Sequence, residues 1–285
     1  IIVPKSVKIA EINEILKNIV RTSSFTRYEE QERHLSQIPK AHFKLFYESP
    51  FDQSEVYVLL DVLFEENPYS RLDSTDIVCP FIDTIPPNVT VKVPSIADIL
   101  GDKLTAFAPN TTGILYDKEK EMEIIKQLFD IESLFDQLST TNGVKDTFIR
   151  CAEQELNYRQ LTEMNYENVL DDIFKTAIII GGRGSFDKET FLKLEDGIRR
   201  IKSHIINRNY IVEEAVVSAS KAAYLSMLLK YRQEDIEKYH PKETLPELEG
   251  VPLFKKMAKI KNFSPEAYYY FAKAQELIRR SEKTK

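Results

Sequence analysis

Residues 94–136 constrain the fold most, because they predict two apolar helices joined by a loop rich in Pro, Asn, Thr and Gly. Ser95 precedes an apolar run and Asp98 follows three residues later, a pattern typical of a capping box at the start of a helix. The buried stripe of this first helix is formed by apolar residues at helical spacing, Ile96, Leu100 and Phe107.

Lys103 falls on the same stripe, between Leu100 and Phe107. An ammonium buried there without a partner would cost on the order of several kcal/mol. Two interpretations stay open. Either the aliphatic stem packs and the charged head reaches water, or the cation points into a cleft.

The second helix, predicted over residues 119–138, is apolar over most of its circumference. Its polar residues form a narrow strip that contains Glu123, Lys126, Gln127 and Asp130. Lys126 and Asp130 are four residues apart and therefore share one face of the helix. The strip is either solvated, with an ion pair between these two residues, or it lines a functional site.

The composition is that of an ordinary soluble globular protein. With 285 residues, the chain is long enough for one large domain or two ordinary ones. Hydrophobic residues make up 42% and charged residues 29%, and no apolar run is long enough for a membrane helix. The net charge of −6 argues against a globally basic nucleic-acid binder.

The two cysteines, Cys79 and Cys151, lie far apart and match no metal-ligand spacing. They indicate free thiols in a reducing compartment, so a cytoplasmic location is expected. The four histidines are equally scattered. The GGRGS segment at 181–185 lacks the Lys and the preceding strand of a phosphate-binding loop, and is expected to be a helix–helix turn in which glycines supply positive φ.

The first part of the chain mixes strand and helix patterns. Apolar periodicity predicts the tail of a strand, then a helix and three strands, over residues 1–3, 7–21, 41–48, 55–64 and 88–93. Irregular polar segments are predicted between them, over 22–40 and 65–87.

Asp61 lies in the middle of the strand 55–64, which is apolar on both faces. Such a strand is expected to be central and covered by helices. A carboxylate there must be hydrogen-bonded, paired with a cation or bound to a metal. It either faces a loop amide near the strand end or is a metal ligand at the edge of the sheet.

After residue 140 the pattern is helical, and five helices are predicted over 144–163, 165–180, 187–207, 212–231 and 264–282. The sequence therefore predicts an α+β fold with two domains. Residues 1–139 form a small mixed-sheet domain that is truncated at its start, and residues 140–285 form an α-helical domain.

Three segments, taken in order, resemble the nucleotidyltransferases of the AbiEii/AbiGii toxin family. They are VYVLLDVLFEE, ILGDKLTAFAPNTTGI and EIIKQLFDIESLF, at residues 56–66, 99–114 and 123–135. The resemblance implies that the mixed-sheet domain is nucleotidyltransferase-like. The family also carries a Gly-Ser and an Asp-x-Asp motif. No Asp-x-Asp occurs in these 285 residues and no Gly-Ser lies upstream, and the opening IIVPK is expected to follow such a strand.

By this resemblance, Asp61 matches the third carboxylate of the family, Lys103 its helix lysine and Asp130 its last aspartate. Asp61 would then be a catalytic residue that holds Mg²⁺ or Mn²⁺ or orients the acceptor hydroxyl, and Lys103 would neutralise the triphosphate. Asp130 would anchor Lys103, hold the site together or act as a base. Gln127 stands where the family usually has Asp, and Lys126 where it has Arg. Both are expected to bind nucleotide, and this departure concerns the role of the position, not the alignment.

The resemblance implies a metal-dependent nucleotidyltransferase that moves a nucleotide from an NTP to an acceptor, with tRNA as the candidate. It also implies a growth-arresting toxin with a cognate antitoxin protein and no membrane partner. Two alternatives stay open. One is a catalytically silent nucleotidyltransferase-like binding module, suggested by the absent Asp-x-Asp and by Gln127. The other is a helical interaction protein whose polar residues are ordinary surface.

Overall fold

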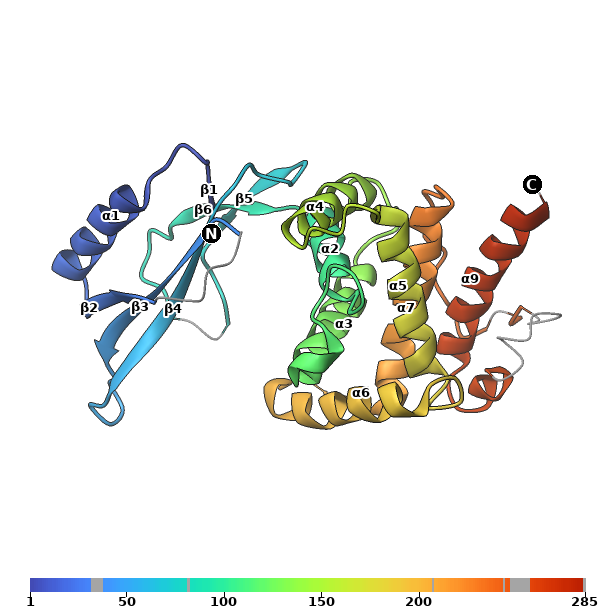
Figure 1. The fold of residues 1–285 in the computed structure, drawn as a ribbon. Helices are drawn as coiled ribbons and strands as arrows, with labels where there is room; N and C mark the ends of the chain where they lie inside the picture. The colour runs from blue at the N-terminus through green and yellow to red at the C-terminus, as the bar shows by residue number, and fades with distance from the viewer. Residues whose placement is uncertain (32–37, 81–82, 207, 243, 247–256, 284–285) are drawn as a thin grey trace. The chain divides into compact units, whose positions relative to one another are not determined.

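The fold is taken from a computed structural model, which describes residues 1–31, 38–80, 83–206, 208–242, 244–246 and 257–283. The chain divides into two compact units, Ile1–Pro68 and Tyr69–Lys285, and each is described by itself (Figure 1). The division falls after Pro68, whereas the sequence predicted a boundary after residue 139. It lies earlier because the helices of segment 94–136 pack with the later helices. The assignment of residues 1–139 to a nucleotidyltransferase-like domain and of residues 140–285 to an α-helical domain stays a prediction.

The first unit is a four-stranded mixed sheet with one helix. Its strands are ordered β1-β4-β3-β2, with β1 parallel to β4 and the other pairs antiparallel. The elements are β1 (Ile2–Val3), α1 (Ile9–Thr22), β2 (Phe25–Glu30), β3 (Lys40–Glu48) and β4 (Glu55–Phe64). The predicted helix and strands of this part are thereby confirmed.

β2 was not predicted, because segment 22–40 was expected to be irregular. The strand does not show the usual alternation of apolar and polar residues, because its register with β3 shifts between Phe25 and Arg27. As a result its two core-facing residues, Phe25 and Tyr28, are three positions apart instead of two. The rest of the predicted irregular segment includes residues 32–37, which lie outside the described residues.

β4 lies inside the sheet, between β1 and β3, as predicted. Only one of its faces is covered in this unit. Val62 belongs to one core with Ile12 and Leu16 of α1. On the opposite face Tyr57 and Leu59 are 48% and 54% exposed. The prediction of helices on both faces is therefore wrong within the first unit, where the apolar pattern includes an open sheet face.

The second unit begins with a small antiparallel sheet and continues as helices. β5 (Leu72–Asp76), which was predicted as loop, pairs with the predicted strand β6 (Thr90–Pro94). The helices that follow are α2 (Ile96–Ala106), α3 (Glu121–Phe135), α4 (Val144–Tyr158), α5 (Tyr166–Gly181), α6 (Lys188–Ile201), α7 (Val212–Lys230) and α9 (Pro265–Lys283). Short 3₁₀ helices lie at Tyr116–Lys118, Lys202–His204 and Ala258–Asn262. The α+β class is confirmed.

The core of this unit is centred on α7, which contacts α3, α5 and α9 (Figure 1). Nearly all of its residues from Ala215 to Leu229 are buried, as expected for a helix that other helices surround. Tyr268, Tyr269 and Tyr270 of α9 are also buried, which confirms that this tyrosine run packs in the helix bundle. Among the described residues, no helix combines the length and the apolar character that crossing a membrane requires.

The predicted turn at GGRGS is confirmed between α5 and α6. Gly184 takes φ of +82°, and Arg183 is also left-handed, with φ of +47°. Gly181 serves close packing instead, because a Cβ there would lie 2.5 Å from the ring of Phe271.

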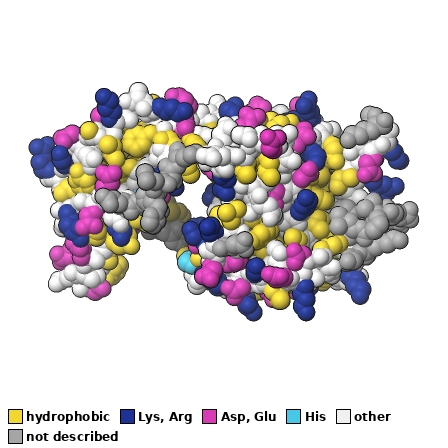
Figure 2. All heavy atoms as spheres, in the orientation of Figure 1, with side chains coloured by type: hydrophobic (Ala, Val, Ile, Leu, Met, Phe, Trp, Pro, Cys, Tyr) yellow, Lys and Arg dark blue, Asp and Glu magenta, His cyan; other side chains and the backbone are white. Residues whose placement is uncertain are grey.

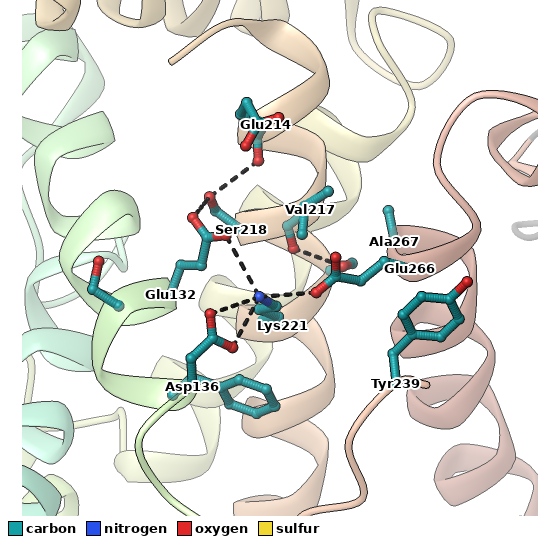
Figure 3. A network of polar contacts seen from close by, with 12 residues as sticks. Glu132, Asp136, Glu214, Val217, Ser218, Lys221, Tyr239, Glu266 and Ala267 are labelled. Atoms are coloured by element: carbon teal, nitrogen blue, oxygen red, sulfur yellow. Dashed lines mark hydrogen bonds and ion pairs between the residues drawn. The ribbon is translucent and has the colours of Figure 1, made fainter. Parts of the chain in front are cut away.

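A buried polar network joins α3, α7 and α9 (Figure 3). Only 4% of the Lys221 side chain is exposed, and its Nζ lies 2.9 Å from Asp136 Oδ1, 3.0 Å from Glu266 Oε1 and 3.5 Å from Glu132 Oε1. Burial alone would lower the pKa of Lys221, but the hydrogen bond to Asp136 and the neighbouring carboxylates raise it overall. The ammonium is thus kept charged inside the unit.

Glu132 is the other buried charge of this network, with 5% of its side chain exposed. It pairs with Arg208 at 2.5 Å and accepts a hydrogen bond from Ser218 Oγ at 2.7 Å. Together with Lys221, these contacts satisfy the carboxylate and fix α3 to α7.

We predict that Lys221→Met lowers the free energy of unfolding by about 3–5 kcal/mol, because it leaves a buried carboxylate without one of its cations. Denaturation by urea measures the loss. The matched control is Lys193→Met, since Lys193 forms an exposed ion pair with Glu189 on α6 and should matter little. Equal stability of the two variants would contradict the prediction.

Candidate functional site

The start of α2 is set by Ser95, the predicted N-cap, whose Oγ accepts the N–H of Asp98 at 3.2 Å. Asp98 has a different role from the one that the capping box predicted. Its side chain is 1% exposed and accepts hydrogen bonds from Ser95 Oγ (2.5 Å), from the backbone N–H of Ser70 (2.7 Å) and Arg71 (3.2 Å), and from Thr147 Oγ1. Asp98 therefore ties α2 to α4 and to the segment before β5.

The predicted residues Lys103, Gln127 and Asp130 come together between α2 and α3. Lys103 Nζ lies 2.8 Å from Asp130 Oδ2 and 3.3 Å from Gln127 Oε1. Gln127 and Asp130 are three positions apart and share one face of α3. About a third of the ion pair is exposed, 32% for Lys103 and 31% for Asp130. The lysine thus combines a packed stem with a paired head that solvent can reach.

Lys126 is exposed and lies outside this cluster. The sequence suggested an ion pair between Lys126 and Asp130 on the surface of one helix. The ion pairs of the described residues instead join Asp130 to Lys103, across two helices. The expected role of Lys126 in nucleotide binding stays a prediction.

Asp61 belongs to the other unit, on β4. Its side chain is 68% exposed, on the sheet face that carries Tyr57 and Leu59. The expectation of a buried carboxylate is therefore wrong, because this face of the strand is open. Asp61 does have a buried partner: His42 Nδ1 lies 2.5 Å from Asp61 Oδ1. Sequence reasoning missed His42, although it alternates with apolar residues on a predicted strand.

The expected divalent metal requires donor groups that converge on one point. Mg²⁺ and Mn²⁺ need several oxygen ligands, and one carboxylate is not a site. Within the described ranges, no group of three or more His, Cys, Asp or Glu side chains could hold an ion. These residues do not form a complete metal site, and the metal stays a prediction.

A second buried carboxylate shapes the loop between α2 and α3. Asp172 of α5 accepts hydrogen bonds from the backbone N–H of Asn110 at 2.7 Å, from the side-chain Nδ2 of Asn110 at 2.6 Å and from Thr111 Oγ1 at 2.9 Å. Burial raises the pKa of Asp172, and these donors offset part of that rise. Sequence reasoning missed this residue, although a carboxylate in the apolar run VLDDIF was a usable signal.

A groove of about 410 Å³ lies beside α2. Its cations, Lys118, Lys120 and Arg159, are accompanied by the carboxylates of Asp102 and Glu155. On the face drawn in Figure 2, the described Lys and Arg side chains are likewise interspersed with Asp and Glu. The second unit therefore offers local cations without a broad basic surface there.

Comparison with known proteins identifies one family. The family model described as "Nucleotidyl transferase AbiEii toxin, Type IV TA system" matches residues 2–231 of the sequence. No curated protein and no solved structure matches the chain. The matched range contains Asp61 and the whole Lys103 cluster.

We predict that Asp98 makes the free energy of unfolding depend on pH in the acidic range. Burial alone would raise its pKa, but the hydrogen bonds from Ser95, Thr147 and two backbone N–H groups lower it overall. The stabilisation is complete above the unfolded value of about 3.9 and disappears as pH falls through the folded pKa. The difference in unfolding free energy between the wild type and Asp98→Asn should therefore shrink in acid. A difference that is constant from neutral pH to strong acid would contradict this.

Proposed function

Because the chain belongs to the nucleotidyl transferase AbiEii toxin family of type IV toxin–antitoxin systems, we propose that it transfers a nucleotide from an NTP to an acceptor hydroxyl, releases pyrophosphate and thereby arrests growth. The observation that carries the proposal is the 2.8 Å ion pair between Lys103 and Asp130. It joins the two helices whose sequences resemble the later motifs of the family.

Lys103 is proposed to bind the triphosphate. An ammonium has three N–H donors, and two of them account for the contacts to Asp130 and Gln127. The third donor and the positive charge would stabilise phosphate oxygens, on which negative charge builds up during transfer. An exposure of about one third leaves the head within reach of a ligand.

Asp130 is proposed to hold the lysine in place. A lysine side chain has four rotatable bonds, and ordering it only when substrate arrives would cost conformational entropy. A carboxylate on the rigid helix α3 removes much of that cost before binding. Gln127 supports the same ammonium, and the exposed Lys126 is proposed to contact the nucleotide from the neighbouring position.

Asp61 is proposed to act on the acceptor. Its carboxylate is 68% exposed and can be reached by a hydroxyl group. It would orient that hydroxyl or accept its proton during transfer. The Mg²⁺ that the resemblance implies stays a prediction, because the described residues do not form a complete site for it.

tRNA is proposed as the acceptor because the family resemblance suggested it. The net charge of −6 gives no general attraction to RNA, so binding would rely on local cations. Membership in a toxin–antitoxin family also implies a cognate antitoxin.

We predict that Lys103→Met and Asp130→Asn each lower kcat/KM for label transfer from NTP to tRNA by roughly 100-fold or more, the scale for losing one aligned donor to the reacting group. Because the two residues form one pair, the double variant should lose little more than either single one. Transfer is measured with α-³²P-labelled NTPs, and growth after induction is followed in parallel.

Lys193→Met serves as the control, since it removes an exposed lysine of α6 outside the cluster. It should keep both transfer and toxicity. Full transfer by Lys103→Met, with the fold intact by circular dichroism, would refute the proposed role of the ion pair.

A further inference from the structure

His42 is a buried side chain in direct contact with the carboxylate proposed to act on the acceptor. It lies on β3 directly opposite Asp61 on β4 in the strand register. His42 is 6% exposed, whereas the side chain of Asp61 is 68% exposed. Because paired residues project to the same face, the contact of 2.5 Å between Nδ1 and Oδ1 joins a buried ring to an exposed carboxylate on one face of the sheet.

The contact determines where the imidazole carries its proton. An ionised carboxylate offers only acceptors, so Nδ1 must be the donor. In a neutral ring Nε2 is then an acceptor, and this atom is buried without a hydrogen-bond partner among the described residues. In that neutral form the one N–H of the ring is committed to Asp61.

This arrangement is unfavourable for folding alone. A buried acceptor without a partner lowers the stability of the fold. A leucine or valine at position 42 would avoid that cost. Ala41 and Phe43, on either side of it in β3, pack on the opposite face in the core with α1. His42 shares its own face with Asp61, and the carboxylate that it contacts accounts for a histidine at this position.

We infer that His42 is a positioning residue that holds the carboxylate of Asp61 in one orientation for the acceptor. The orientation of an exposed carboxylate is set by the groups that donate hydrogen bonds to it. The buried ring of His42 donates to Oδ1 and thereby helps to fix that orientation. The inference rests on the proposed function, in which Asp61 acts during transfer.

The kinetic test compares two substitutions in the full-length protein. His42→Leu removes the donor, and His42→Asn keeps an N–H near the position of Nδ1. His42→Leu should lower kcat by about 10-fold to 100-fold with little change in KM for the NTP, and His42→Asn should recover most of the rate. In an Asp61→Ala background, His42→Leu should have no further effect. The control His204→Leu, at an exposed histidine, should keep the wild-type kcat.

A wild-type kcat in His42→Leu, or a His42→Asn variant that is folded yet as slow as His42→Leu, would overturn the inference. So would losses that multiply in the double variant, because the two residues would then act independently.

A second measurement needs no enzymatic activity. Long-range ¹H–¹⁵N spectra of the histidine side chains report the ring tautomer, with the His42 signals assigned by their loss in His42→Asn. The wild type should show Nδ1–H, and Asp61→Ala should change that tautomer population. An Nε2–H tautomer in the wild type, or no change in Asp61→Ala, overturns the inference. An inactive wild type that shows Nδ1–H overturns the proposed function and still establishes the contact.

Discussion

The ion pairs around Lys221 are the interaction on which the rest of the helical unit depends. They attach Glu132 of α3 and Asp136, the C-cap residue of α3, to α7, which is almost wholly buried. α3 therefore has two polar faces with separate tasks. The face with Glu132 is fixed inside the bundle, and the face with Asp130 points to Lys103. A helix fixed in this way can hold the Lys103 ammonium in one position.

α2 is held with equal firmness. Asp98 binds donors at its start, and Asp172 binds the loop after its end. Both carboxylates offset their loss of water with several hydrogen bonds each. The network also reaches beyond the matched range 2–231, because Glu266 of α9 contacts Lys221. The last helix thus supports the part of the chain that carries the family resemblance.

Periodicity predicted the helices and most of the strands because burial repeats along a single element. The helices that begin after Ser95 and Lys120, and the strand that carries Asp61, lie close to where the sequence placed them. Periodicity missed β2 because a bulge interrupts its alternation of apolar residues. It also predicted that both faces of β4 are covered, whereas one face is exposed. Both errors concern what lies beside a strand, which its own pattern does not record.

For the candidate site, the sequence by itself determined which residues are chemically unusual: a lysine on an apolar stripe, a polar strip on an apolar helix, and a carboxylate in an apolar strand. The tertiary structure alone decided their partners. It pairs Asp130 with Lys103 and not with Lys126, and it pairs Asp61 with His42. The physical reason is that spacing in a sequence fixes neighbours along one helix or strand, whereas partners on different elements depend on packing and register.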